Sequence, residues 1–479
     1  MSGLLVPNFS LIIPELLLLV GICVVLIVDA FTRDTFKIIS YWLAQLFVVT
    51  TAVFAVVFAP NTSVIGFSGT FVTDPMSVVL KVGILTLTLF SFLYSKRYLL
   101  DRNEFRAEYY VLGMTAALGM MILVSAHSLL SLYLGLELLS LSLYAMVAMH
   151  RDSSLAAEAA MKYFVLGALA SGILLYGISL LYGITGTLDL GELTLRVSEH
   201  SRDNLVLILG LVFILVGLCF KLGAVPFHMW VPDVYQGAPA PVTLFIGSAP
   251  KLAAFGMLIR LLVDGLPALQ PDWNQILILL SILSMGLGNV VAIAQTNLKR
   301  MLAYSTIAHV GFLFLGVIAG SDGGYAAGMF YVIIYSAMAL GGFGMIVLLS
   351  RKGFEAQQLA DFRGLNDRNW WYAAMMLILM LSMAGVPPFA GFWAKWAVLQ
   401  EVIAAGYVWL AALAVFFAVI GLFYYLRVVR LMYFEVSNEK APIVPDSDMR
   451  VAISVNALAI LFVGIYPAAL MGLCFNALG

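Results

Sequence analysis

Long apolar runs dominate this sequence and leave few possibilities for its fold. Runs of about 20 residues, each long enough to cross the hydrocarbon core of a bilayer, recur between short polar breaks along all 479 residues. Hydrophobic residues make up 63% of the chain and charged residues only 11%, which is too little polar surface for a water-soluble domain. The sequence therefore predicts an all-α polytopic membrane protein embedded in a lipid bilayer.

Reading the apolar runs in order gives fourteen predicted spans. They are centred near residues 20, 48, 83, 116, 138, 169, 214, 252, 284, 309, 337, 388, 420 and 460. The first run, from Leu11 to Val28, lacks a preceding basic region and a small-residue cleavage site. We therefore expect it to be a retained span and not a signal peptide.

Lysine and arginine are distributed unevenly between the predicted loops. Loops that follow odd-numbered spans hold seventeen of these cations, whereas the loops on the opposite side hold only three, Arg196, Arg202 and Arg260. Because basic loops stay on the cytoplasmic side, we expect both termini to lie on the outer side. The remaining five of the 25 lysines and arginines lie inside spans: Lys81, Lys162, Lys221, Lys251 and Lys395.

Two spans are longer than one crossing requires and contain proline near their middle. The seventh runs from about Asn204 to Tyr235 and breaks at Pro226, and the twelfth runs from about Trp370 to Ala405 and breaks at Pro387 and Pro388. A proline interrupts the helical hydrogen-bond ladder, and broken helices place ion sites at mid-depth in transporters.

The two breaks also suggest an internal repeat, because Ala224-Val-Pro-Phe can be aligned with Gly385-Val-Pro-Pro-Phe five spans later. A unit of five helices is odd in number, so its second copy would enter the membrane from the other face as an inverted repeat. The expected divisions are three N-terminal spans in 1–107, the first repeat in 108–265, the second repeat in 270–436 and a final span in 437–479.

Titratable side chains on five different spans fall at one depth. Counting about 1.5 Å per residue from the start of each span places five of them near the middle of the bilayer: Glu137, Lys221, Lys251, His309 and Lys395. Lys162 lies nearer the cytoplasmic start of span six, with Glu158 one helical turn before it. A row at one depth predicts proton transfer parallel to the membrane plane, with Lys162 as its link to the cytoplasm.

A static role is the alternative for each of these groups. A lysine in a span can extend its ammonium group to the interface or form a fixed ion pair, and either suits Lys81 near the outer end of span three. Three central lysines face a single central carboxylate, Glu137, which is a poor balance for static pairs. Desolvation favours the neutral form of a buried amine, so these lysines can exchange protons. His228 and His309 can relay protons or serve as structural hydrogen-bonding groups, and both alternatives stay open.

Other kinds of site have little support in the residues. The three cysteines, Cys23, Cys219 and Cys474, are isolated in apolar runs, and the five histidines show no close pairing that would bind haem or a metal on one helix. Cations are scattered through the loops and the net charge is -1, so no nucleic-acid surface is expected. We expect no redox centre, cofactor or metal in this chain.

The chain resembles the antiporter-like membrane subunits of respiratory complex I and of the multi-subunit cation/proton antiporters. The resemblance covers nearly the whole chain, and its anchors are Glu137, Lys221 with the following Val-Pro-Phe-His, Lys251 and Lys395. Within that family, the lysine at position 395 and the end of the chain soon after the fourteenth span separate it from types that carry a glutamate there or a long C-terminal lateral helix.

The resemblance implies specific roles for these residues. Glu137 and Lys221 would form a charge pair that modulates proton uptake, and Lys395 would be the terminal group. The hydrated path between them would continue through Lys162, Lys251 and His309. Lys81 is not part of this pattern, and its role stays open.

The function implied is that of a proton-translocating subunit of a NADH:quinone oxidoreductase in the bacterial inner membrane. Its partners would be other membrane subunits, including other antiporter-like ones. The complex as a whole would use FMN, iron–sulfur clusters and quinone, with quinone reduction occurring outside this chain. The alternative is a subunit of a multi-subunit sodium/proton antiporter, which has no redox partner.

Overall fold

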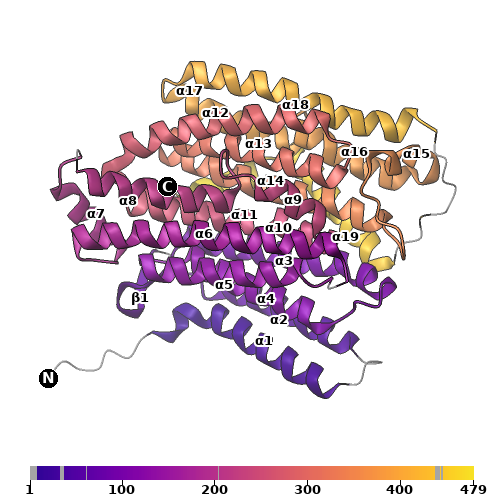
Figure 1. Ribbon diagram of the computed structural model, residues 1–479, viewed down its shortest axis with the longest axis horizontal. Helices are drawn as coiled ribbons and strands as arrows, with labels where there is room; N and C mark the ends of the chain where they lie inside the picture. The colour runs from indigo at the N-terminus through magenta and orange to yellow at the C-terminus, as the bar shows by residue number, and fades with distance from the viewer. Residues whose placement is uncertain are drawn as a thin grey trace.

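The computed structural model describes residues 8–32, 37–60, 62–150, 152–202, 204–436, 443 and 446–478. Nearly all elements are helices, and most of them run along the longest axis of the molecule (Figure 1). The predicted all-α polytopic fold is confirmed. Three of the basic loop residues behind the topology prediction, Arg33, Arg151 and Lys440, lie outside the described residues.

The first eight predicted spans correspond to helices that begin and end near the expected polar breaks. They are α1 (Ile13–Phe31), α2 (Ile38–Val57), α3 (Pro75–Asp101), α4 (Ala107–Val124), α5 (Leu129–Val147), α6 (Ser154–Thr185), α8 (Leu205–Leu222) with α9 (Trp230–Gly237), and α10 (Ala240–Gly247) with α11 (Ala249–Leu258). The eighth span ends in a π-helical turn, η4 (Ile259–Asp264), and a short helix α7 (Leu190–Glu199) joins spans six and seven.

The last six predicted spans are α12 (Gln270–Ala294), α13 (Leu298–Ile318), α14 (Asp322–Leu349), α16 (Trp370–Ala384) with α17 (Ala390–Ala404), α18 (Val408–Phe434) and α19 (Ser447–Ile465). Thirteen helical segments among the described residues are long and apolar enough to cross a membrane. The twelfth span is not among them because its break leaves two halves of 15 residues each. With that span added, the count of about fourteen agrees with the sequence.

A few short elements were not expected from the sequence. Residues between spans two and three form an antiparallel hairpin of β1 (Val64–Gly66) and β2 (Phe71–Thr73), because β-branched and aromatic residues flank a turn there. The other short elements are α15 (Leu365–Arg368), α20 (Ala468–Leu478) and the 3-10 turns η1 (Phe9–Ile12), η3 (Phe67–Gly69), η5 (Pro267–Leu269) and η6 (Leu359–Phe362).

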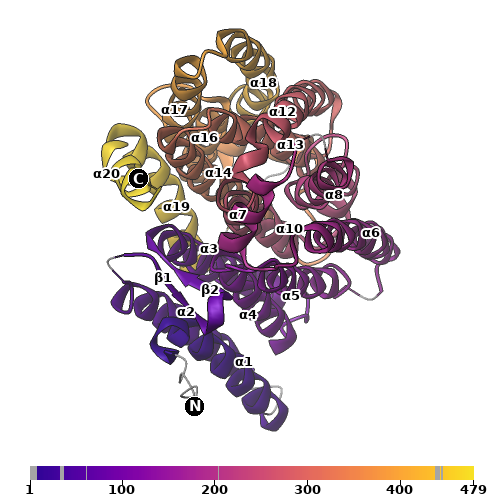
Figure 2. The same ribbon diagram turned by 90° about the vertical axis from the view of Figure 1, so that its left-hand side faces the viewer.

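The view along the helices separates the interior of the bundle from its edges (Figure 2). α1 and α2 lie at one edge and α17 and α18 at the other, while α10, α13 and α14 lie in between. In the apolar 18-residue stretches of α10 to η4, α13 and α14, the share of residues that are buried is 100%, 94% and 89%. The corresponding share is 33% in α1, α6 and α18. Polar groups on the middle helices are therefore surrounded by protein, where a charged side chain is least costly in a membrane.

The two broken spans stop their first halves in the same way. α8 ends at Gly223 with φ 81°, and α16 ends at Gly385 with φ 85°, a left-handed conformation that glycine adopts without steric cost. The N–H groups of both glycines donate back to the last helical turn, to Cys219 and to Leu381. The caps therefore match Gly223 with Gly385. The sequence alignment instead matched Ala224 with Gly385, one position later, because the second break contains two prolines where the first contains one.

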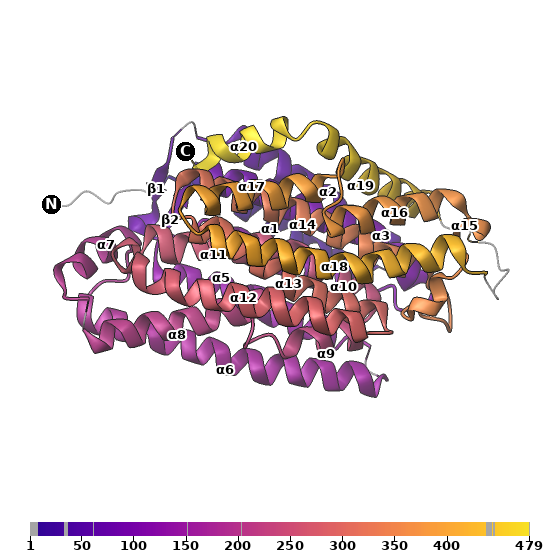
Figure 3. The same ribbon diagram turned by 90° about the horizontal axis from the view of Figure 1, so that it is seen from above.

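The two half-helices also run in opposite directions. α8 begins after α7, and α16 begins after α15, and α7 and α15 lie at opposite ends of the bundle (Figures 1 and 3). Their capped ends therefore both point from the membrane surfaces toward the middle of the molecule.

Candidate functional site

The five candidate residues of the mid-depth row lie on different helices of the bundle. Glu137 is in the middle of α5, Lys221 in the last turn of α8, Lys251 in the first turn of α11, His309 in the middle of α13 and Lys395 in α17 after the break. Figure 2 shows α5, α8, α13 and α17 spread across the bundle. The contacts of each candidate residue show how it is held.

Glu137 and Lys221 line one small cavity. The Lys221 ammonium group is buried and donates a hydrogen bond to Ser140 Oγ at 3.0 Å, and Glu137 accepts a hydrogen bond from Ser171. The cavity between them has a volume of about 20 Å³, which is room for about one water molecule. In the described structure the two charged groups make no direct ion pair, so the implied charge pair can act only across this space.

Lys251 binds the end of the broken helix that carries Lys221. Its ammonium group donates to the carbonyl oxygen of Leu222, the last residue of α8, at 2.8 Å, and lies 5.9 Å from the centre of the Trp230 ring. The carboxyl end of a helix has a partial negative charge, which favours a cation there. Because Leu222 directly follows Lys221, the two lysines occupy neighbouring positions at the break.

Lys395 has the same relation to the second break. Its ammonium group donates to the carbonyl oxygens of Met383 and Ala384, the last two residues of α16, at 3.1 and 3.0 Å. The same nitrogen lies 5.2 Å from the centre of the Phe312 ring on α13. Each broken span thus ends at a lysine ammonium group inside the protein.

His309 lies within a cluster of tyrosines. Its Nδ1 is 2.6 Å from the Tyr331 hydroxyl and its Nε2 is 3.1 Å from the Tyr425 hydroxyl, while its ring faces that of Tyr335 at 4.7 Å. Tyr331 also stacks on Phe312, the ring beside the Lys395 ammonium group. Both ring nitrogens of His309 therefore lie against neighbouring hydroxyl groups.

The tyrosines were missed in the sequence. Tyr331 and Tyr335 stand four residues apart in one span, which places them on one helix face. With 21 tyrosines in the chain, that spacing alone does not indicate a site. Only the structure shows that Tyr331 and Tyr335 of α14 and Tyr425 of α18 all contact His309 of α13.

Lys162 lies outside the row, as its position in the sequence suggested. Its side chain is 43% exposed and forms ion pairs with Glu158 at 2.8 Å and with Asp233 at 2.8 Å. Asp233 also binds Arg300 at 2.7 Å, so α6, α9 and α13 are joined by charges at one end of the bundle. Asp233 was missed because its partners come from distant parts of the chain.

The two remaining uncertain residues have clearer surroundings in the structure. Lys81 forms a 2.7 Å ion pair with Glu15 of α1, and both side chains are buried, which corresponds to the fixed ion pair among its alternatives. His228 is half-buried in the turn of the first break, and its Nδ1 has no hydrogen-bond partner among the described residues. His228 is not in contact with the row in the part of the chain that the structure describes.

Metal ligands do not gather in the described part of the chain, where no three His, Cys, Asp or Glu side chains come together in a group that could hold a metal ion. The row itself consists of one carboxylate, three ammonium groups and one imidazole, all of which can gain or lose a proton.

Comparisons with known proteins agree on one family. Residues 126–421 match the family described as NADH:quinone oxidoreductase/Mrp antiporter, TM. The chain is 54% identical over 474 residues to NADH-quinone oxidoreductase subunit N of Thioalkalivibrio sulfidiphilus, with 99% of each chain covered. It is 31% identical to a chain of respiratory complex I from Thermus thermophilus with bound aureothin, with a TM-score of 0.83 and coverage of 96% of this chain and 99% of that one.

A second solved structure has a likeness of shape only. A chain of the Mrp complex from Dietzia superposes with a TM-score of 0.86 over 98% of this chain and 97% of that one, at 19% identity. At that identity the likeness concerns the fold and does not favour an antiporter over a respiratory subunit.

Proposed function

Because this chain belongs to the family of subunit N of NADH-quinone oxidoreductase, we propose that the row from Glu137 to Lys395 is the path along which it moves protons. The chain is an antiporter-like, proton-pumping subunit of complex I in the bacterial inner membrane, and its partners are the other membrane subunits of that complex. The assignment of individual residues to the path is our proposal.

The observation that carries the assignment is the position of Lys251 and Lys395. Each donates to the terminal carbonyl groups of a broken helix, Lys251 to α8 and Lys395 to α16. A helix end offers carbonyl acceptors and a partial negative charge, which favour an ammonium group there. Two such ends give the path two fixed positions at which a proton can be held.

In this proposal the groups act in their order across the bundle. Lys221 and Lys251 occupy neighbouring positions at the first break, so a proton held on one repels a proton on the other. Glu137, across the small cavity, attracts a proton held on Lys221. The second half of the path runs through the hydroxyl groups around His309 to Lys395, whose ammonium group lies beside Phe312, the ring stacked on Tyr331.

In this proposal no redox step occurs in the chain. FMN, iron–sulfur clusters and quinone belong to other parts of the complex, and the free energy of quinone reduction reaches this subunit through its membrane neighbours. Lys162 supplies the first link to the cytoplasm through Glu158 and Asp233.

We also propose that spans four to eight and nine to thirteen are inverted copies of one unit. The support is the matched glycine caps at Gly223 and Gly385, the opposite directions of α8 and α16, and a lysine at each capped end. In such an arrangement the two halves present similar ion-binding ends from opposite faces of the membrane.

The basic loops should face the cytoplasm and both termini the periplasm. Single cysteines at Ser63 and at Asn103 test this orientation, since these residues lie in loops at opposite ends of α3. We expect a membrane-impermeant maleimide added to intact spheroplasts to label the cysteine at 63 and to leave that at 103 unlabelled. The reverse pattern would contradict the orientation.

Replacing Lys395 by alanine should lower the number of protons pumped per electron, because the terminal amine of the path is lost. Pumping is measured in membrane vesicles during NADH oxidation, with Lys352→Ala, an exposed lysine in a turn, as the control. Lys395→Arg keeps a cation for the carbonyl groups of Met383 and Ala384 but cannot release its proton, so it should fail as well. An undiminished proton yield in both variants would remove Lys395 from the path.

A further inference from the structure

One buried lysine takes no part in the row described above. Lys299, in the first turn of α13, has a side chain only 3% exposed, although its place in the sequence suggested a loop cation. Its ammonium group donates to the carbonyl oxygen of Ala238 at 2.7 Å and lies 3.5 Å from Glu355 Oε1. Burying a charge with so few close partners is costly, and such groups mark ion pathways in membrane proteins.

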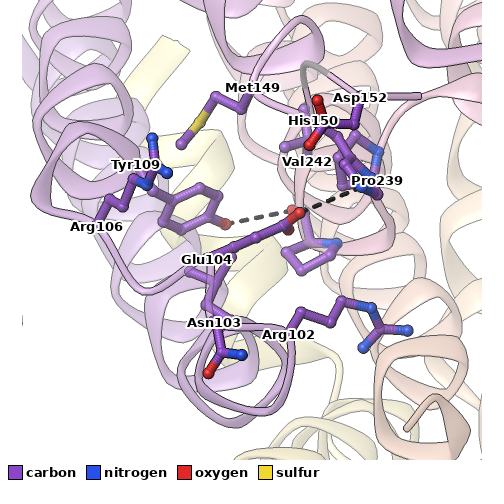
Figure 4. Close-up of a pocket in the computed structure, with 12 residues that line it drawn as sticks. Arg102, Asn103, Glu104, Arg106, Tyr109, Met149, His150, Asp152, Pro239 and Val242 are labelled. Carbon is purple, nitrogen blue, oxygen red and sulfur yellow. Dashed lines mark hydrogen bonds and ion pairs between the residues drawn. The ribbon is translucent and has the colours of Figure 1, made fainter. Parts of the chain in front are cut away.

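Toward the surface, an open pocket lies next to the two partners of Lys299. Glu355 also binds the Tyr98 hydroxyl at 2.7 Å and Arg102 at 3.3 Å. A pocket of about 410 Å³ is lined by Arg102 and by Pro239, the residue that follows Ala238, so it reaches the neighbours of both Lys299 contacts (Figure 4). A polar pocket of this volume holds many water molecules.

The same pocket is lined by polar side chains that are open to water. Glu104 and His150, in the loops after α3 and α5, lie 3.3 Å apart in its lining, and both are partly exposed (Figure 4). Arg102, which lines the same pocket, binds Glu355. One side chain therefore separates the water in the pocket from Glu355.

Toward mid-depth, Tyr235 lies beside Thr306, which stands between Lys299 and His309 on α13. Tyr235 is fully buried, and its nearest polar neighbours are Thr306 and Tyr335; among the described residues its hydroxyl makes no hydrogen bond of regular geometry. A buried hydroxyl of this kind points to a bound water molecule. Tyr235 lies three residues before Ala238, the carbonyl that binds Lys299.

The groups beyond Tyr235 lead to the row. Tyr335 donates to Thr306 Oγ1 at 2.7 Å, and its ring faces His309. Lys299, Thr306 and His309 follow at intervals of seven and three residues on α13, which places them on one face of that helix. A column of polar groups thus runs along α13 from the basic end of the bundle to mid-depth.

We propose that Lys299 and Tyr235 form a second proton-uptake route, which leads from Glu355, beside the pocket lined by Arg102, along one face of α13 to His309. The inference rests on the proposed function, because it requires the row to carry protons. It adds a supply to the second half of the row that is separate from Lys162.

The transfer balances at each step. Glu355, whose side chain is partly exposed, takes a proton from water and becomes a carboxylic acid, then gives that proton to the neutral amine of Lys299 and returns to a carboxylate. The Lys299 ammonium group releases the proton to water beside Tyr235. The hydroxyl groups of Tyr235, Thr306 and Tyr335 pass it on, each donating one proton as it accepts another. It reaches His309 through the hydroxyl of Tyr425, which lies near Tyr335 and is hydrogen-bonded to His309 Nε2.

Lys299→Arg in the intact complex is the first test. Arginine keeps the positive charge near Glu355 and Ala238, but it cannot release a proton at physiological pH. We expect fewer protons pumped per electron with NADH oxidation and complex assembly retained. Lys96→Arg is the matched control, because Lys96 is an ion-paired lysine at the same end of the bundle, 2.6 Å from Asp448 and away from α13.

Tyr235→Phe is the second test, because it removes only the hydroxyl and keeps the ring. We expect the proton yield to fall here too. Tyr110→Phe is its control, since Tyr110 is also fully buried with an unpartnered hydroxyl but packs against Tyr41 and Phe92, away from the column. An equal loss in both tyrosine variants would show a packing effect and overturn the role of Tyr235.

The outcomes separate this inference from the proposed function. If Lys395→Arg lowers the proton yield while Lys299→Arg and Tyr235→Phe pump normally, the row stands and the second uptake route is wrong. If Lys395→Arg, Lys299→Arg and Tyr235→Phe all pump normally, the proposed function itself fails. A loss in Lys299→Arg that Lys96→Arg does not share supports the route.

Discussion

Replacing Lys221 by alanine is expected to abolish proton pumping by this subunit. Lys221 is the only titratable side chain of the row that lines the cavity with Glu137 and also adjoins the residue bound by Lys251. Without its amine the proposed path is interrupted between Glu137 and Lys251. Groups that transfer protons in a rate-limiting step typically contribute about 10²- to 10⁴-fold to its rate, so a strong defect should appear in initial rates of proton uptake into vesicles.

Two companion variants separate transfer from structure. Lys221→Arg can keep a hydrogen bond to Ser140 but cannot release its proton, so it should pump as poorly as the alanine variant. Cys219→Ala changes a buried residue two positions earlier on the same helix and should pump normally. Full pumping by Lys221→Arg would mean that only the charge of Lys221 matters.

Much of the fold could be predicted because hydrocarbon permits so few structures. Inside a bilayer the backbone must satisfy its own hydrogen bonds, so each apolar run of sufficient length is a helix. Prolines at 226, 387 and 388 gave the two breaks, and the glycines at 223 and 385 proved to be the residues that end the half-helices. The hairpin of β1 and β2 was missed because three-residue strands carry too weak a pattern.

The partners of the row could not be predicted in the same way. Depth depends on position along one helix, and counting residues gives it directly. Contacts depend on rotation and packing between helices, as in the bond from Lys251 to the carbonyl of Leu222 or the tyrosines around His309. A backbone carbonyl as acceptor leaves no signal in the sequence, because every residue has one.

Burial near the ends of helices was the other failure of the sequence. Lys299 and Arg260 both lie beside polar breaks, where a cation normally extends into water. In the structure the exposed fraction of the whole residue is 2% for Lys299 and 4% for Arg260. Loops from elsewhere in the chain fold over both residues, and the local sequence contains no trace of that covering.

Arg260 is therefore the residue whose loss should most reduce stability. Its guanidinium group binds both carboxylate oxygens of Asp74 at 2.8 Å, Asp264 at 2.9 Å and the carbonyl oxygen of Val124 at 3.1 Å. It thus joins the start of α3, the end of α4 and the π-helical turn of η4. Removing one partner from a buried ion pair typically costs about 3 to 5 kcal/mol, because the other charge is left buried and unpaired.

The contribution of the Arg260–Asp74 pair to stability should depend on pH. Burial alone would raise the pKa of Asp74, but the Arg260 guanidinium and the hydrogen bonds from Ser77 hold that pKa below its usual value. A carboxyl with a lowered pKa in the folded state stabilises the protein above its unfolded pKa and loses that contribution as pH falls. The wild-type protein should therefore lose this part of its stability only in acid.

In Arg260→Met the change of stability with pH should have the opposite direction. Without the guanidinium group, burial dominates at Asp74 and raises its pKa, so the variant should be least stable near neutral pH and recover part of the difference as the carboxyl is protonated. The thermal midpoint of the purified complex at neutral and mildly acidic pH measures both. Arg196→Ala is the control, because Arg196 is half-exposed and its pairs with Glu192 and Glu199 should be worth less than about 1 kcal/mol. If Arg260→Met has the thermal midpoint of the wild type at every pH, packing alone holds α3, α4 and η4 together, and Arg260 does not contribute to stability.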